Sequence, residues 1–231
     1  MFQKTAAAQW KGLMTEDTIR VLDTIEKQIG DDYYPAPENV LRFLRMEHPV
    51  RVVIVGMDPY PSFNERDSLP QATGRSFEVS ELFGQGWDYK IRQSSLRNML
   101  KAVHYNVTGQ DCSMEELRQE IASGAFQIAP PTQWFDGLEE QGVLFLNSTL
   151  TVKPGKAGSH QKYWEPFRQI LIPYLDRMGA VWMLWGNNAR DEVGAYLSSD
   201  SRVLTAAHPR MPDFVKNNTF KDVPEINWQC V

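Results

Sequence analysis

Residues 52–62 of the chain read VVIVGMDPYPS, an apolar run that turns abruptly into a loop. The first four residues are β-branched, which is typical of a buried strand, and one glycine and two prolines then end the regular structure. Asp58 therefore follows the carboxyl end of a predicted strand. Because open α/β sheets bind their ligands at that edge, the stretch predicts both an α/β fold and the location of a functional site.

Three further strand-like runs also end on polar or glycine-rich residues. They span residues 143–146, 181–185 and 202–206. Asn147, Gly186 and His208 follow these runs, so an amide, a glycine turn and a histidine accompany the acid. Helical segments separate the strands, which favours parallel pairing with all four carboxyl ends at one edge. The sequence thus predicts a single domain over residues 1–231, with a central four-stranded parallel sheet flanked by helices.

Several local signals predict the helices and loops around this sheet. Thr15 can cap a helix that ends at Gly30, and Ser113 with Glu116 has the spacing of a capping box. Further helices are expected near residues 37–44, 95–105 and 164–177 and after Gly186. Residues 61–93 are rich in Gly, Ser, Pro and Asn, and they are too long for a simple connection. We expect a binding loop there.

The net charge of −5 at pH 7 argues against general attraction to phosphate groups. The charge is uneven, however, because residues 151–221 contain ten Lys/Arg and six Asp/Glu, a net of +4 against −9 for the rest. A local basic face on an acidic body suits a protein that scans DNA weakly and then releases it. Ordinary solvated charges are the alternative explanation.

The two cysteines and the lengths of the apolar runs argue against a disulfide-linked, metal-binding or membrane-spanning protein. Cys112 and Cys230 lie far apart and form no metal-binding spacing, so we expect no disulfide, no metal site and no cofactor. No signal peptide opens the chain and no apolar run reaches the length of a membrane span. The expectation is a cytoplasmic protein, or a nuclear one in a eukaryotic or viral setting, without membrane contact.

Five motifs, in order, resemble those of the family 1 uracil-DNA glycosylases. They are DPY at 58–60, QA at 71–72 with Gly74 and Phe77, LN at 146–147 with LTV at 150–152, LWG at 184–186, and AHP at 207–209. The resemblance implies a monofunctional enzyme of base excision repair, which flips deoxyuridine out of DNA and hydrolyses its N-glycosidic bond. It would release uracil, leave an abasic site and need no cofactor.

The resemblance implies that Asp58 and His208 are catalytic. Asp58 would position the attacking water and stabilise the cation-like sugar, and His208 would donate a hydrogen bond from a neutral imidazole to uracil O2. Taken alone, each residue could be structural, Asp58 as a turn former before proline. The other motifs favour the catalytic interpretation.

Four residues would bind the base: Met57, Tyr60, Phe77 and Asn147. The Asn147 amide could pair with uracil O4 and N3–H, whereas cytosine presents its donor and acceptor in the opposite sense. Tyr60 would exclude the C5 methyl group of thymine, and Phe77 would stack on the flipped base. Both aromatics could instead be core residues, Phe77 especially, because residues 75–79 are strand-like in composition.

Ser62, Ser95, Gly186 and Asn187 resemble the residues of the family's loops that hold phosphates, which implies contacts with the DNA backbone, although Ser95 could simply cap a helix. The chain also departs from the family at three places. Pro61 stands where most members have histidine, and residues 91–94 replace a proline-rich loop. Residues 208–212 lack the family's Ser-Pro-Leu-Ser loop, whose leucine fills the gap that the flipped base leaves. We therefore predict Arg210 or Met211 as the wedge, with 214–215 as the next candidates.

Two other functions stay open from the sequence. One is a mismatch-selective or single-strand-selective glycosylase, which typically has asparagine where Asp58 stands. The other is a DNA-binding or replication-accessory protein with the same fold. The expected partners are uracil-containing DNA, single- or double-stranded, and a phage-type inhibitor protein that mimics DNA. The chain is expected to be a monomer.

Overall fold

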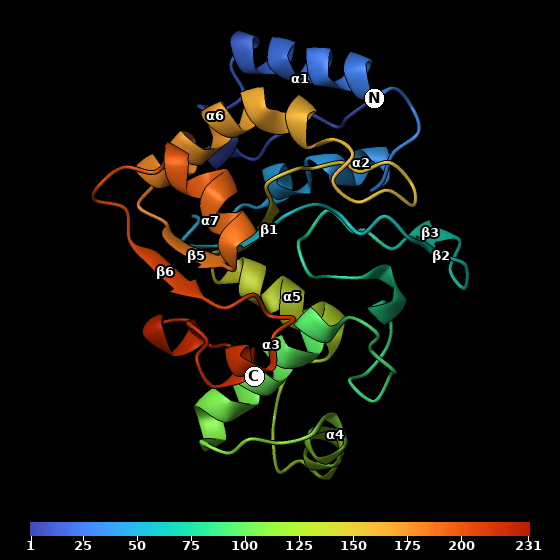
Figure 1. Ribbon diagram of the computed structural model, residues 1–231, viewed down its shortest axis with the longest axis vertical. Coiled ribbons are helices and arrows are strands. Elements are labelled where there is room, and N and C mark those ends of the chain that lie inside the picture. Colours follow the sequence, from blue (N-terminus) through green and yellow to red (C-terminus); the bar gives the residue numbers. More distant parts are fainter.

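The central sheet of the computed structural model, which describes residues 1–231, has the predicted four parallel strands (Figure 1). They are β1 (Val52–Gly56), β4 (Val143–Asn147), β5 (Val181–Trp185) and β6 (Val203–Ala206), in the spatial order β4-β1-β5-β6. The register pairs Gly56 with Asn147, so β1 and β4 end at the same level. The prediction of an α/β fold with a four-stranded parallel sheet is confirmed.

Helices cover both faces of the sheet, as Figure 1 shows. One side carries α1 (Glu16–Ile29), α2 (Pro37–Val40), α6 (Gln161–Arg177) and α7 (Asn187–Val193). The other side carries α3 (Ser94–Thr108), α4 (Met114–Ser123) and α5 (Pro131–Glu140). Each face has its own apolar core, and alternate residues of β1 serve the two: Val52 and Ile54 pack on the α3–α5 side, Val53 and Val55 on the α1 side. This two-sided burial explains why β1 is apolar throughout.

The capping signals are confirmed where they can be checked. Thr15 Oγ1 accepts a hydrogen bond from the Thr18 amide at 3.2 Å, and Gly30 ends α1 with a φ of 70°. Ser113 and Glu116 form the complete capping box of α4. The helix expected near residues 37–44 is instead a short α2 followed by a 3₁₀ helix, Arg42–Arg45.

Two features were not predicted. The first is helix α5, which has Gly137 in its interior. The Cys230 side chain packs against this glycine, since a Cβ built on residue 137 would stand 3.2 Å from Cβ of Cys230. The long loop contains a small hairpin of β2 (Phe63–Asn64) and β3 (Leu69–Pro70). The remaining 3₁₀ helices are Ala8–Trp10, Ser80–Leu82, Gly194–Tyr196, Pro212–Val215 and Phe220–Asp222.

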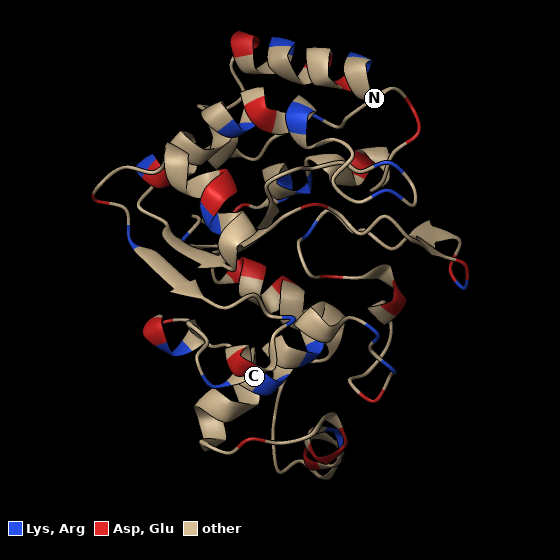
Figure 2. Ribbon diagram, in the orientation of Figure 1, with Lys and Arg blue, Asp and Glu red and all other residues tan.

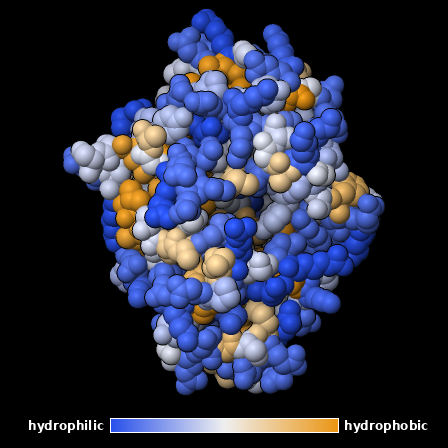
Figure 3. All heavy atoms as spheres, in the orientation of Figure 1, coloured by the Kyte–Doolittle hydropathy of each residue, from blue (hydrophilic) through white to orange (hydrophobic).

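The surface carries mixed charge. Figure 2 shows Lys and Arg interspersed with Asp and Glu over most elements, and in Figure 3 hydrophilic residues dominate the visible face. None of the helices combines the length and the apolar character needed to cross a membrane. No group of three or more His, Cys, Asp or Glu side chains is arranged to hold a metal ion.

Candidate active site

A cavity of about 490 Å³ opens at the carboxyl edge of the sheet, the size of many ligand pockets. It is lined by eleven of the twelve predicted site residues: Met57, Asp58, Tyr60, Phe77, Ser95, Asn147, Gly186, Asn187, His208, Arg210 and Met211. The exception is Ser62, an exposed residue at the base of the hairpin, whose carbonyl accepts the Gln71 amide at 2.9 Å. The four strand ends thus meet around one cavity, as parallel pairing requires.

Asp58 has one carboxylate oxygen engaged and one free of hydrogen bonds within the protein. Oδ2 accepts the Gly158 amide at 2.6 Å, across 100 residues of sequence. Burial raises the pKa of the Asp58 carboxyl, and the hydrogen bond from Gly158 opposes this shift. A fixed carboxylate with a free oxygen and raised proton affinity is suited to accept a proton from a bound water. The contribution of Gly158 could not be predicted from the sequence.

Asn147 lies at the end of β4 with only 5% of its surface exposed. Its carboxamide makes no hydrogen bond with any other protein group and lines the cavity. Gly56 makes room for it, because a Cβ at that position would stand 2.4 Å from Asn147 Oδ1. The end of β1 must therefore be glycine for the amide to reach the cavity, and the amide is available to a ligand.

The His208 ring is held in one tautomer. Its Nδ1 accepts the backbone amide of Arg210 at 3.1 Å, so in the neutral ring the proton is on Nε2. Burial, followed by the positive charge of Arg210, lowers the pKa of His208 below its usual value. The imidazole is therefore a neutral donor through Nε2 at pH 7. Gly186, with a φ of 83°, allows the close approach, since a Cβ there would lie 3.0 Å from Cβ of His208.

Phe77 does not lie in a strand, contrary to the strand-like interpretation of residues 75–79. Only an isolated bridge joins Ala72 and Val79, and Phe77 between them has a left-handed φ of 65°. The ring packs against Trp185 with the centroids 6.0 Å apart. The turn brings Phe77 to the cavity wall while leaving it 9% exposed. Phe77 therefore combines a core contact with a place on the cavity wall.

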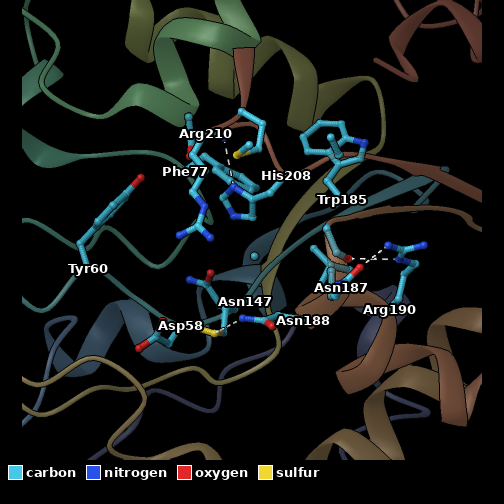
Figure 4. A pocket seen from close by; sticks show the side chains of 18 of the residues that line it. Asp58, Tyr60, Phe77, Asn147, Trp185, Asn187, Asn188, Arg190, His208 and Arg210 are labelled. Carbon is cyan, nitrogen blue, oxygen red and sulfur yellow. Dashed lines mark hydrogen bonds between the residues drawn. The ribbon is translucent and has the colours of Figure 1, made fainter. Parts of the chain in front are cut away.

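Met57 and Tyr60 flank Asp58 and Pro59 on the loop after β1 and line the cavity. Figure 4 shows Asp58 and Tyr60 among the side chains around it. Burial, with a smaller contribution from the charge of Glu81, raises the pKa of the Tyr60 hydroxyl, which therefore remains protonated. The Met57 sulfur accepts a hydrogen bond from the Asn188 side chain at 3.2 Å. This contact links the loop after β1 to the start of α7.

Four of the residues described above surround the inner part of the cavity. We call Asp58, Phe77, Asn147 and His208 the pocket wall.

The outer rim of the cavity is formed by Asn187, Arg190, Arg210 and Met211, all of them exposed. Met211 is 48% exposed. Arg190 reaches back to the Asn187 side chain and to the Gly186 carbonyl. The Asn98 side chain supports the other loop by donating to the Pro209 carbonyl at 2.7 Å. We call Asn187, Arg190, Arg210 and Met211 the outer rim.

Two sequence interpretations need correction or addition. Phe214 and Val215, the reserve candidates for the wedge, are 0% and 3% exposed and pack in the core, so they cannot reach DNA. Arg75 and Arg190 also line the cavity, although the sequence analysis assigned neither to the site. Arg190 follows the glycine turn by four residues, which was the available signal. The signal for Arg75 was weaker, because its partners are distant in the sequence.

Curated relatives of this chain share one name. No family model matches the chain. A protein of Chromobacterium violaceum named uracil-DNA glycosylase is 35% identical over 190 residues, covering 80% of this chain and 67% of the relative. A protein of Francisella philomiragia with the same name is 30% identical over 223 residues, covering 88% of each.

Solved structures share the fold. The wild-type UNG of Nitratifractor salsuginis superposes with a TM-score of 0.74 at 21% identity, covering 98% of this chain and 93% of that one. A mimivirus UNG variant in complex with UGI superposes with a TM-score of 0.64 at 19% identity, covering 87% of this chain and 69% of that one.

Proposed function

The chain belongs to the uracil-DNA glycosylase family, and on that premise we propose how its own residues excise uracil from DNA. The activity is hydrolysis of an N-glycosyl bond in base excision repair. The assignment of roles rests on one observation above all: a free carboxylate, an unpaired amide and a neutral histidine surround the same cavity. Each has a distinct task in releasing a base.

The base is selected by the Asn147 amide. Its oxygen would accept from uracil N3–H and its nitrogen would donate to O4, so both polar atoms of an amide that faces the cavity without a partner in the protein would be paired. Cytosine would place an acceptor opposite the amide oxygen and a donor opposite its nitrogen, so binding it would leave polar groups mismatched. Phe77 would stack on the ring, and Tyr60 would occupy the space that the thymine methyl group needs.

Hydrolysis breaks the C1′–N1 bond, whose electron pair moves onto the uracil ring. The sugar becomes cation-like, and the negative charge of Asp58 stabilises it. A water held by the free oxygen of Asp58 would form the new bond to C1′ and give its proton to that carboxylate. The raised pKa of Asp58 favours this transfer. The N–H at Nε2 of His208 would donate a hydrogen bond to uracil O2 as charge develops there, without losing its proton.

The abasic strand is expected to remain intact after the base departs. Cleavage through a Schiff base requires an amine close to C1′, and the lining of the cavity contains no lysine. Water is therefore the nucleophile in the proposed reaction, and a monofunctional glycosylase is the result.

The outer rim would hold the DNA strand. Asn187 and Ser95 offer donors to phosphates, and Arg190 adds a cation beside them. Gly186 forms the turn that precedes Asn187, while its own amide donates to the Ala206 carbonyl at 2.9 Å. Arg210 and Met211 would enter the stack when the nucleotide flips, because they are the exposed residues that follow His208. We propose that this wedge fills the gap less well than a leucine loop, so that single strands are preferred over duplexes and a DNA-mimicking inhibitor binds weakly. The enzyme would act as a monomer in the compartment that holds the DNA.

A gel assay on an oligonucleotide with one uracil tests the proposal. The same sequence is offered as a single strand and opposite adenine or guanine. We expect uracil release from all three, fastest from the single strand. Activity confined to the U·G pair would instead indicate a mismatch-selective enzyme. Tight binding of uracil-containing DNA without any release would indicate an accessory DNA-binding protein.

A further inference from the structure

Arg75 is a buried cation at the cavity, and the proposed reaction does not use it. Its side chain is only 6% exposed, and the residue lines the cavity two positions before Phe77. All three guanidinium nitrogens are engaged. Nε donates to Glu139 at 2.6 Å, Nη1 pairs with Glu78 at 3.1 Å and Nη2 pairs with Asp136 at 2.8 Å. Each nitrogen of Arg75 is therefore already paired with a carboxylate of the protein.

The partners of Arg75 come from two parts of the fold. Asp136 and Glu139 lie on α5, and Glu78 directly follows Phe77. Glu78 is 2% exposed, and its second oxygen accepts the Thr73 hydroxyl at 2.6 Å. The guanidinium thus joins both sides of the turn at Phe77 to each other and to a helix behind it.

The turn itself needs such support. Phe77 has a left-handed φ of 65°, a conformation that an aromatic residue adopts only when its surroundings impose it. Ser76 is tied to the sheet, since its amide donates to the Phe145 carbonyl at 3.2 Å and its hydroxyl to that of Ile54, also at 3.2 Å. The opposite side of the turn depends on Glu78, which Arg75 holds.

Stability alone is a poor explanation for this network. Taking several charges out of water costs about as much as their attraction returns, and apolar replacements of similar volume are often equally stable. A buried ion network does, however, require one geometry, because each charge is satisfied only when every partner is in place. The feature whose geometry it fixes here is the Phe77 ring.

We propose that Arg75 is a positioning residue: through Glu78, Asp136 and Glu139 it holds the Phe77 ring as the platform for the flipped base, and it thereby sets how tightly the pocket binds uracil. This inference rests on the proposed function, because it assigns the stacking role to Phe77. Arg75 does not touch the base, so it contributes to binding and leaves the chemical step to the pocket wall.

The test compares Arg75→Met, Arg75→Lys and the double variant Arg75→Met/Glu78→Gln with wild type. The double variant removes the unpaired acid beside the lost cation, so it remains informative if Arg75→Met alone does not fold. Arg118→Met is the matched control. Arg118 also ties a loop to a helix, donating to the Trp87 and Tyr89 carbonyls at 3.0 and 3.1 Å, but it does not line the cavity.

We expect the double variant to raise both the KM for single-stranded uracil DNA and the inhibition constant of free uracil by about ten-fold, the scale of one lost base stack. The kcat should fall less than about three-fold, because uniform binding is lost and transition-state stabilisation is kept. Arg75→Lys, which keeps the charge, should recover part of the affinity. Arg118→Met should leave both constants unchanged.

Hydrogen exchange provides a readout that does not depend on activity. In the uracil-free protein, the peptide spanning residues 71–82 should exchange faster in the Arg75 variants and at the wild-type rate in Arg118→Met. Unchanged exchange together with unchanged uracil inhibition in the folded double variant would overturn the inference, as would an equal rise in the inhibition constant for Arg118→Met. Absence of uracil cleavage and inhibition in wild type would instead count against the proposed function, and the exchange result would still decide whether Arg75 holds the turn.

Discussion

The pocket wall and the outer rim line the same cavity but are built in different ways. Asn147 and Phe77 of the wall are 5% and 9% exposed, and Asp58 and His208 each accept a backbone amide. The rim residues are exposed, and their longest side chains, Arg190, Arg210 and Met211, extend from loop and helix ends. The groups proposed to select and release the base are thus held by burial or by backbone hydrogen bonds, whereas the groups proposed to bind DNA are exposed at the periphery of the cavity.

This difference suggests how the two regions respond to substitution. A buried group whose partners are fixed contributes to one step and tolerates little change. An exposed side chain contributes modestly, and its effect depends on the substrate and on salt. Changes in the wall should therefore alter chemistry or base choice on every substrate, and changes in the rim should alter the preference between single-stranded and duplex DNA.

The largest effect is expected from Asp58→Asn. The amide oxygen can still accept from the Gly158 amide, but the side chain has neither the charge nor the basicity that the proposed reaction requires. Single-turnover cleavage should fall by about 10²–10⁴-fold, the typical contribution of a general base. The Kd for uracil-containing DNA should change little. Near wild-type cleavage by this variant would remove Asp58 from the mechanism.

Asn147→Asp should alter base choice. A carboxylate lacks the donor for uracil O4, so kcat/KM for uracil should fall by about 10²-fold or more, since a buried polar group is left mismatched. When protonated, the acid presents a donor and an acceptor that suit cytosine, and slow cytosine excision should become detectable. Loss of uracil cleavage without any cytosine release would leave only a structural role for this amide.

Tyr60→Ala should admit thymine. Removal of the ring opens space beside the C5 position, and uracil excision should weaken by about 10-fold because packing against the edge of the base is lost. The measurement is release of radiolabelled thymine from a T-containing strand, with the wild type as control. If uracil activity falls and thymine still fails to react, another residue excludes the methyl group.

Arg210→Ala and Met211→Ala, made separately, probe the rim. Inserted side chains offset the few kcal/mol that unpairing and unstacking cost, and a single strand requires little of this help. Excision from duplex should therefore slow by about 3–10-fold more than excision from single strands. Equal slowing on both substrates would place the wedge elsewhere, although not at the buried residues Phe214 and Val215.

The smallest effect concerns the stability of the pocket wall. Burial raises the pKa of Asp58 above its usual value, so folding favours the protonated carboxyl. That stabilisation is complete below the unfolded pKa of about 3.9 and is lost as the pH rises through the folded pKa. Asp58→Asn should therefore have a Tm slightly above wild type at pH 7, by less than the ~2–4 °C that about 1 kcal/mol gives in a chain of this size. A Tm of Asp58→Asn below that of the wild type at pH 7, with equal Tm values for the two proteins in acid, would contradict this prediction.

The sheet and most of the cavity could be predicted because the relevant signals are local. Each strand is a continuous apolar run, and each functional residue follows one directly, so parallel pairing is enough to bring Asp58, Asn147 and His208 together. Arg190 was missed although its partners, Gly186 and Asn187, are local. Two other missed features depend on distant partners. The Gly158 amide reaches Asp58 across 100 residues, and Arg75 pairs with Glu139 across 64.

Local composition was misleading at two places for the same reason. Residues 75–79 look like a strand, but ties to the sheet, to α5 and within the turn force Phe77 into a left-handed conformation. Residues 214–215 follow the predicted wedge closely in the sequence, yet Phe214 packs on Trp185 with ring centroids 4.9 Å apart. In both cases tertiary contacts override the sequence pattern.

The central claim is that the pocket wall releases uracil by water attack, and the fate of the DNA strand tests it most directly. A 5′-labelled single strand with one uracil is incubated with the wild-type protein, and half of the sample is heated in alkali before electrophoresis, while free uracil is measured in parallel. The account predicts one molecule of uracil per strand, an intact strand without alkali and cleavage at the uracil position after it. An intact strand after alkali, with no free uracil, would contradict it, and so would strand cleavage without alkali.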